Sequence, residues 1–265
     1  MRGGALRMDV GIPTLVEMKS VEEASCFASS HGFSFVELNM NLPWCTLESL
    51  QKVDLKALSD AHGIYFTIHA DENLFFCDFS DRIADAHLQN ILDAIALSKE
   101  NSIPLINFHM NRGVYFTLPG EKVYLFDRYR DFYLDRIRHF KDACSEKAGY
   151  DVTLCIENTG IREEFVWQGI DMLLESPSFS LTWDLGHDYT AASIDSPRLL
   201  TRKNRIAHIH LHDATRKDCH LPLGNGEMPI DAMLSSVSPK RMVLEVKTME
   251  GIRASVPWLK ERQYI

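Results

Sequence analysis

Short apolar segments alternate with longer amphipathic segments along the whole chain, and this alternation limits the folds open to it. Eight apolar segments are predicted to be strands, at residues 10–14, 34–38, 65–69, 105–109, 152–157, 180–184, 207–211 and 242–246. Helical periodicity is found at residues 21–30, 47–61, 81–99, 129–147 and 249–259. Ser20 and Thr46 occupy cap positions, and Gly32 and Gly63 stand where helices should stop. Strands that alternate with helices predict a parallel sheet with helices outside it.

Eight strands in 265 residues match the size of an α/β (β/α)8 TIM barrel. A doubly wound sheet is the competing fold, and it usually carries a glycine-rich phosphate turn after its first strand. Here the first strand runs into Pro13-Thr14-Leu15, which is no such turn. Because no Pro/Gly/Ser linker interrupts the alternation, we expect a single barrel domain over residues 1–265.

The composition narrows the partners and the compartment. Asp and Glu number 37 against 28 Lys and Arg, a formal net charge of −9 that disfavours broad binding to nucleic acid. Six cysteines without a C-x-x-C pair, and an N-terminus without an apolar core, indicate a cytoplasmic protein with reduced thiols. No apolar run approaches the roughly 18 to 20 residues that span a bilayer, so no membrane association is expected. A homodimer through the outer helices remains open.

Acidic and histidine residues end seven of the eight predicted strands. They are Glu37, His69, His109, Glu157, Asp184, His210 and Glu245. In a barrel the carboxyl ends of all strands meet at one mouth, where active sites are built. Period-two alternation points these side chains inward and sends their apolar neighbours towards the helices. The sequence therefore predicts a cluster of carboxylates and imidazoles at the mouth.

Such a cluster indicates a divalent metal site. Carboxylate and imidazole ligands suit Mn²⁺, Zn²⁺, Co²⁺ and Mg²⁺, and a cation offsets the repulsion between buried carboxylates. The loops after the sixth and seventh strands add further candidate ligands, His187 and the pair Asp218 and His220. His208 is expected below His210 as a hydrogen-bonding partner rather than a ligand. His212 is expected either to cap a loop or to support the ligands from behind.

The segments that carry these residues resemble the xylose-isomerase-like TIM-barrel superfamily, which includes sugar isomerases and epimerases and the endonuclease IV family (AP endonuclease family 2). The resemblance rests on Thr67-Ile-His-Ala70, Asn107-Phe-His109, Cys155-Ile-Glu-Asn-Thr159, Trp183-Asp-Leu-Gly-His187, His208-Ile-His-Leu-His-Asp213, Asp218-Cys-His-Leu-Pro-Leu-Gly-Asn-Gly226 and Leu244-Glu-Val246. These segments follow one another in the order of that superfamily.

The isomerase branch implies one metal held by two glutamates, an aspartate and a histidine, which here are Glu157, Asp184, His210 and Glu245. It implies that Glu157 and Glu245 also act as base and acid on a sugar or sugar phosphate, through an enediolate. It further implies that His187 and Arg216 hold substrate oxygens and that Glu163 binds the substrate by orienting it or by orienting His187.

The endonuclease IV branch implies instead a phosphoester hydrolase with two or three Zn²⁺ ions. That branch adds two earlier histidines and an Asp-x-His pair, matched here by His69, His109, Asp218 and His220. The acidic net charge favours the isomerase or epimerase, with the hydrolase as the alternative. A binding module with a purely structural metal is the third reading, and between one and three metal ions are compatible with the residues present.

The predicted connection after the fourth strand, residues 110–126, is long for a barrel loop. It is expected either to cover the mouth as a lid or to pack on the surface by its own aromatic residues.

Overall fold

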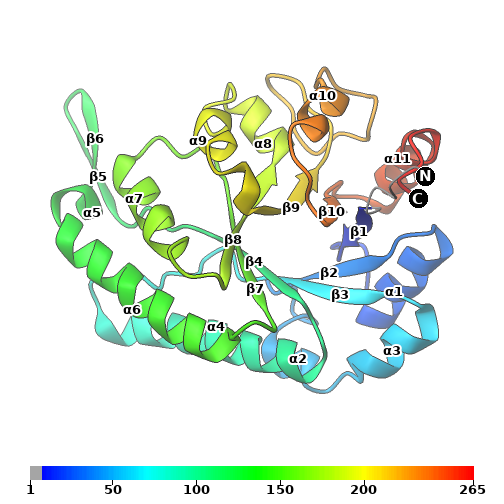
Figure 1. Cartoon of the computed structure of the whole chain (residues 1–265), viewed down its shortest axis with the longest axis horizontal. Coiled ribbons are helices and arrows are strands. Elements are labelled where there is room, and N and C mark those ends of the chain that lie inside the picture. The colour runs from blue at the N-terminus through cyan, green and yellow to red at the C-terminus, as the bar shows by residue number, and fades with distance from the viewer. Residues whose placement is uncertain (1–7) are drawn as a thin grey trace, which may run out of the picture.

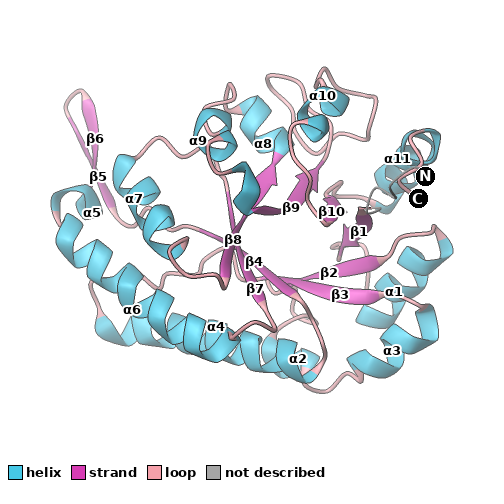
Figure 2. Ribbon diagram, viewed as in Figure 1, coloured by secondary structure: helices cyan, strands magenta, loops and turns pink. Residues whose placement is uncertain are grey.

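The computed structural model describes residues 8–265, and eight parallel strands in it close into a barrel (Figures 1 and 2). Neighbours around the barrel follow the order β1-β10-β9-β8-β7-β4-β3-β2. The strands are β1 (Asp9–Pro13), β2 (Phe35–Asn39), β3 (Tyr65–His69), β4 (Leu105–His109), β7 (Thr153–Glu157), β8 (Phe179–Asp184), β9 (Ile206–Leu211) and β10 (Arg241–Leu244). The predicted (β/α)8 barrel is confirmed, and each strand lies within two residues of its predicted position.

Helices cover the outside of the barrel and begin where the sequence provides caps. They are α1 (Val21–Ser30), α2 (Leu47–Leu50), α3 (Leu55–His62), α4 (Asp81–Glu100), α5 (Leu125–Arg128), α6 (Arg130–Ala148), α7 (Glu164–Leu173), α8 (Leu185–Thr190), α9 (Ser196–Leu200), α10 (Ile230–Ser235) and α11 (Met249–Glu261). The Ser20 hydroxyl accepts a hydrogen bond from the N–H of Glu23, and that of Thr46 accepts one from Ser49. Gly63 ends α3 with a positive φ of 64°, a conformation that glycine adopts without a steric penalty.

The single helix predicted over residues 47–61 is wrong, because the chain forms two helices there. Helix α2 ends at Leu50, and Asp54 then caps α3 by accepting a hydrogen bond from the N–H of Ala57. An aspartate makes this bond only from a non-helical backbone, so it starts a new helix instead of continuing the old one.

The long connection after β4 forms a hairpin rather than an irregular loop. Strands β5 (Tyr115–Leu118) and β6 (Glu121–Tyr124) pair antiparallel and project from the barrel beside α7 (Figure 1). Its apolar side chains Tyr115, Phe116 and Leu118 are exposed. Lys122 lies 3.8 Å from the centre of the Tyr115 ring, so the hairpin is held partly by its own side chains.

The apolar core lies between the barrel and its outer helices. Phe108 points outward from β4 against Phe140 of α6, which in turn stacks on Phe76 with the ring centres 3.9 Å apart. These rings are fully or almost fully buried, and each contributes roughly 1.5–3 kcal/mol through removal of apolar surface from water. The outward face of each strand is thereby committed to packing, which leaves the inward face for polar side chains at the mouth.

The six cysteines carry free thiols, as the absence of paired spacing predicted. Among residues 8–265 no helix is both long enough and apolar enough to cross a bilayer.

A test of the barrel interior is the Gly11→Ala substitution. Gly11 pairs in register with Phe35, and a methyl group at Gly11 would lie 2.4 Å from the Phe35 ring. We expect this overpacking to lower the free energy of unfolding by about 1–3 kcal/mol, measured by urea denaturation. Val16→Ala, at an exposed position five residues further on, is the control and should change the stability little. Equal stability of the two variants would contradict the packing described.

Candidate metal centre at the barrel mouth

Four side chains from consecutive strands converge at the carboxyl end of the barrel. Glu157 ends β7, Asp184 ends β8, His210 lies near the end of β9, and Glu245 follows β10 directly. One ligand-type atom from each residue lies within 4.8 Å of the ligand atoms of the other three. The structure therefore brings together the four residues that the isomerase resemblance implied as one metal group.

The charges in this group compensate one another because all four side chains are buried. Nδ1 of His210 lies 3.3 Å from Oε2 of Glu157 and 3.4 Å from Oε2 of Glu245. Burial alone would raise the pKa of Glu157 and lower that of His210, but the opposite charges override burial. The neighbouring imidazoles, His210 first, hold the pKa of Glu157 well below its usual range. In turn, Glu157, Glu37 and Glu245 raise the pKa of His210 well above its usual value.

Unsatisfied polar atoms in this group fit a metal ion. Oδ2 of Asp184, Nδ1 of His210 and Oε2 of Glu245 are buried without a hydrogen bond of acceptable geometry. Buried polar atoms without partners are rare, because each costs the free energy of its lost hydration. Three such atoms that converge from three strands suit a hard or borderline divalent cation, so the residues present fit the ion that the family implies.

A second group shares Glu157 and lies on the other side of it. Nε2 of His69 lies 3.3 Å from Oε2 of Glu157, and Nε2 of His109 lies 3.1 Å from the same oxygen. Nδ1 of His69 donates to the carbonyl oxygen of Ala70 at 2.8 Å, which leaves Nε2 as the nitrogen that faces the group. Both predicted histidines therefore stand where they can add ligands for a second ion.

A third group consists of three imidazoles beside Asp184. Nε2 of His187 lies 3.3 Å from Nε2 of His220, and Nδ1 of His187 lies 2.9 Å from Oδ2 of Asp184. The third imidazole is His212, whose Nε2 lies 3.3 Å from Oδ1 of Asp184. Burial alone would lower the pKa of His187, but the carboxylate of Asp184 overrides burial and raises this pKa to about 11. Burial lowers the pKa of His220 to about 4.

Asp218, which the endonuclease resemblance implied as a ligand, is not part of any of these groups. It lies in an exposed turn and accepts a hydrogen bond from the hydroxyl of Thr215. His212 occupies the place beside His187 and His220 instead. The expected loop-capping role of His212 is confirmed, because its Nδ1 accepts a hydrogen bond from the N–H of His220 at 2.8 Å. Its Nε2 adds a contact with Asp184, and the sequence signal for this contact was the inward parity that His212, directly after β9, shares with His208 and His210.

Two of the three residues expected to hold substrate lie apart from the buried groups. Glu163 precedes α7 and forms an ion pair with Arg112 at 3.2 Å. Arg112 also donates to the carbonyl oxygens of Thr159 and Gly160. Arg216 is exposed, with its guanidinium 4.0 Å from the centre of the Tyr189 ring, which belongs to the same helix as His187.

A polar layer beneath the metal group holds its ligands from inside the barrel. Asn107 donates to Oε2 of Glu157 at 2.5 Å and accepts a hydrogen bond from Thr182. Glu37 lies 2.9 Å from Nε2 of His210 and is hydrogen-bonded to His208. The hydrogen bond predicted for His208 is present, with Glu37 as its partner. Glu37, His208 and His210 also form a fourth group of ligand-type atoms. Each residue of this layer lies two positions before a mouth residue on its strand or at the equivalent level of another strand. This spacing was the sequence signal that could have identified the layer.

The first turn of α8 has no room for a side chain at Gly186. A Cβ atom there would lie 1.9 Å from the ring of His212. Because Gly186 has no side chain, the ring of His212 can pack against the turn that joins Asp184 to His187.

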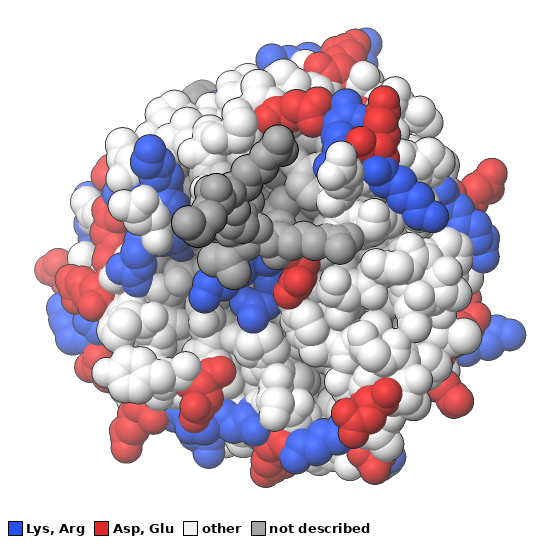
Figure 3. Space-filling model, turned by 45° about the vertical axis from the view of Figure 1, so that its right-hand side comes forward, with Lys and Arg blue, Asp and Glu red and all other residues white. Residues whose placement is uncertain are grey.

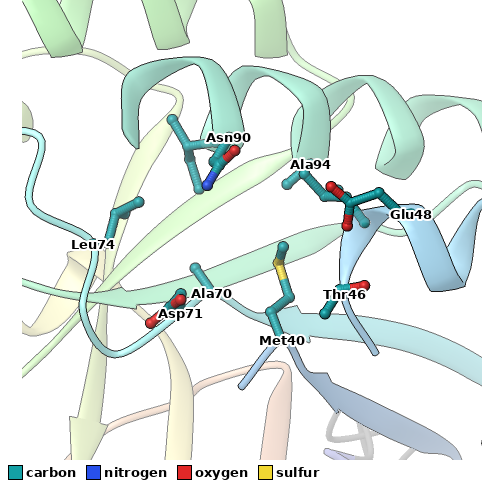
Figure 4. Close-up of a pocket in the computed structure, with 10 residues that line it drawn as sticks. Met40, Thr46, Glu48, Ala70, Asp71, Leu74, Asn90 and Ala94 are labelled. Atoms are coloured by element: carbon teal, nitrogen blue, oxygen red, sulfur yellow. The ribbon is translucent and has the colours of Figure 1, made fainter. Parts of the chain in front are cut away.

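A separate pocket lies outside the barrel wall, between α4 and the ends of β2 and β3 (Figure 4). Asn90 and Ala94 line it from α4, and Met40, Ala70 and Asp71 face them from the strand ends. None of the ligand-type residues of the mouth lines this pocket, so it is distinct from the candidate metal centre.

Comparison with known proteins identifies the family and the fold. The sequence model of one family, the xylose isomerase-like TIM barrel, matches residues 27–262. No curated protein matches the sequence of the chain significantly.

Several solved structures share the whole fold. A D-tagatose 3-epimerase-like protein superposes with a TM-score of 0.75 and 21% identity, covering 97% of each chain. The 3-keto-D-glucoside 4-epimerase YcjR from E. coli superposes with a TM-score of 0.73 and 14% identity, over 97% of this chain and all of that one. The IolI protein, solved with a bound zinc atom, gives 0.71 and 14%, over 97% and 99% of the two chains.

The raised pKa of His210 makes a prediction about metal binding. A divalent ion that binds Nδ1 of His210 must displace a proton, so the apparent affinity for Zn²⁺ or Mn²⁺ should increase with pH. We expect about a tenfold increase per pH unit for each proton released, continuing above the ordinary histidine pKa of about 6.5. Competition with a chelating dye between about pH 6 and pH 8 measures this slope. His139→Gln, on the exposed side of α6, should keep it. A pH-independent affinity would contradict the assignment of His210 as a ligand.

Proposed function

This chain belongs to the family of xylose isomerase-like TIM barrels, and on that basis we propose that it is a divalent-metal-dependent isomerase or epimerase of a sugar or sugar phosphate. The observation that carries the proposal is the convergence of Glu157, Asp184, His210 and Glu245, three of which present buried atoms without hydrogen bonds. The printed names of two solved structures with the same fold are those of sugar epimerases or epimerase-like proteins, which supports the substrate class.

Glu157 and Glu245 are the proposed base and acid. They come from strands separated in the barrel by β8 and β9, so a substrate between them meets a carboxylate on each side. One glutamate removes the proton from the carbon between a carbonyl and a hydroxyl group, and the other returns a proton to the resulting enediolate. A bound divalent ion, held by the four-residue group, would supply Lewis-acid polarisation of the substrate oxygens.

The environment of each glutamate suits this role. Oε1 of Glu245 lies 2.6 Å from Nζ of Lys247, and Oε2 of Glu157 is hydrogen-bonded to Asn107. Both contacts stabilise the ionised carboxylate, the form that accepts a proton. The glutamate that acts as acid must therefore first take up a proton from water or from a substrate hydroxyl before it returns one to the enediolate. His187 and Arg216 are the proposed donors to substrate oxygens, and Glu163 with its partner Arg112 borders the approach from the hairpin side.

Substitution of either glutamate tests the proposal. Glu157→Gln and Glu245→Gln should each lower the rate of proton transfer at carbon by about 10²–10⁴-fold, because an amide cannot accept the proton. Incorporation of deuterium from solvent into D-allulose or D-tagatose, followed by NMR, measures that rate. Glu175→Gln, at an exposed position that forms an ion pair with Lys141, is the control. Exchange at the normal rate in both Gln variants would overturn the assignment.

A phosphoester hydrolase is the second candidate function. The groups formed by His69, His109 and Glu157, and by His187, His212 and His220, offer ligands for two further ions. Asp218 lies outside them, and on the face seen in Figure 3 the basic side chains are interspersed with acidic ones. The position of Asp218 removes one of the ligands that the hydrolase resemblance implied. The mixed charges on this face do not favour the binding of a nucleic acid backbone.

His109→Ala distinguishes the two functions. His109 is not one of the four residues of the isomerase group, although it lies 3.1 Å from Oε2 of Glu157. In a one-metal isomerase the variant should therefore weaken deuterium exchange without abolishing it, because no ligand of the single ion is lost. In a multinuclear hydrolase the same change should abolish the cleavage of abasic DNA, because a metal ligand is lost. His139→Ala is the matched control on α6. If the wild-type protein cleaves abasic DNA, the variant does not, and neither protein exchanges deuterium into a ketose, the hydrolase replaces the isomerase as the proposed function.

A further inference from the structure

Glu37 is a fully buried carboxylate one layer below the metal group, and it is not among its candidate ligands. It lies on β2, and its side chain reaches across the barrel interior to β9, which is separated from β2 by β1 and β10. Oε1 lies 2.9 Å from Nε2 of His210. Oε2 is hydrogen-bonded to Nε2 of His208 at 3.1 Å and accepts a hydrogen bond from the Thr67 hydroxyl at 3.0 Å.

Both nitrogens of His210 lie beside carboxylate oxygens, Nε2 at 2.9 Å from Glu37 and Nδ1 at 3.3 Å from Glu157, and neither contact has the geometry of a hydrogen bond. The contact with Glu37 decides which proton His210 keeps when a cation displaces the other. A carboxylate oxygen 2.9 Å from an imidazole nitrogen would repel a lone pair on that nitrogen, so Nε2 is the protonated atom. A neutral His210 then has its lone pair on Nδ1. That nitrogen faces the metal group, 3.3 Å from Oε2 of Glu157. Glu37 thus selects the tautomer that can bind a cation.

The other contacts of Glu37 fix its own orientation. The ring of His208 and the hydroxyl of Thr67 occupy Oε2, which leaves Oε1 for His210. A charged carboxylate is costly to bury, and an apolar side chain of similar size would close this layer without that cost. The cost is understandable if the carboxylate acts on His210, because carboxylates behind metal-bound histidines fix ring orientation and raise ligand basicity.

We propose that Glu37 is a positioning residue that holds His210 in the Nε2-protonated tautomer and thereby sets the affinity of the mouth for its divalent ion. This inference rests on the proposed metal-dependent function. Strand β2 supplies no ligand to the four-residue group, but through Glu37 it takes part in metal binding. His208 and Thr67 act through Glu37, as the residues that keep its carboxylate aligned.

Glu37→Gln tests the proposal with a side chain of the same shape. We expect the affinity for Zn²⁺, measured by competition with a chelating dye, to fall about 10–100-fold. In the zinc-loaded protein, ¹⁵N-edited NMR should show Nε2–H for His210 in the wild type and a loss of that pattern in the variant. His210→Gln identifies the signal by its disappearance.

Leu154→Ala is the control, because Leu154 is fully buried on β7 but belongs to the apolar core outside the barrel interior. It should lower the melting temperature while the affinity for Zn²⁺ stays within about threefold of wild type. This separates ligand positioning from a general loss of stability.

The outcomes separate this inference from the proposed function. Wild-type zinc affinity and an unchanged His210 signal in Glu37→Gln would overturn the role of Glu37 and leave the metal-dependent function standing. A wild-type protein that binds neither Zn²⁺ nor Mn²⁺ would overturn both. If Glu37→Gln fails to fold, Glu37→Asp withdraws the carboxylate by one methylene and should still weaken zinc binding.

Discussion

The burial of Glu157 is the constraint on which the rest of the mouth depends. Its side chain is 1% exposed, and a carboxylate at that depth is tolerated only among compensating charges and donors. Three imidazoles lie within 3.3 Å of its Oε2, and Asn107 donates to the same oxygen. The concentration of histidines at the mouth therefore answers an electrostatic need, and the same arrangement provides the ligands of a cation. Stability and metal chemistry share one set of atoms here.

The barrel and its four-residue centre were predictable from sequence because both follow from a short-range rule. Alternation along a strand decides which side chains face inward, and strand closure places the last inward residue of every strand at one mouth. This rule places Glu157, Asp184 and Glu245 at the mouth without any knowledge of how the strands are ordered, whereas their grouping with His210 as one metal site was implied by the family resemblance. Element boundaries followed equally well where a cap was present, as at Ser20.

What the sequence did not reveal depends on contacts between distant segments or on competition between local signals. Asp54 interrupts a helical pattern because its side chain bonds the next turn, and periodicity alone does not register that choice. The preference for His212 over Asp218 beside Asp184 is decided by how the loop after β9 turns, which sets one side chain inward and the other into solvent. The contact of Glu37 with His210 joins residues 173 positions apart across the barrel. Only the closed barrel brings them together.

The close packing of Gly186 against His212 divides the mouth into a part that tolerates sequence change and a part that does not. Any side chain at Gly186 would displace the imidazole of His212, which faces Asp184. Gly186 and His212 can therefore change only together. The β5–β6 hairpin is under no such restriction, because Tyr115 and Phe116 are exposed and form no part of the ligand groups. Changes that adapt this barrel to a new substrate are therefore expected in the hairpin, whereas the turn at Gly186 should stay constant.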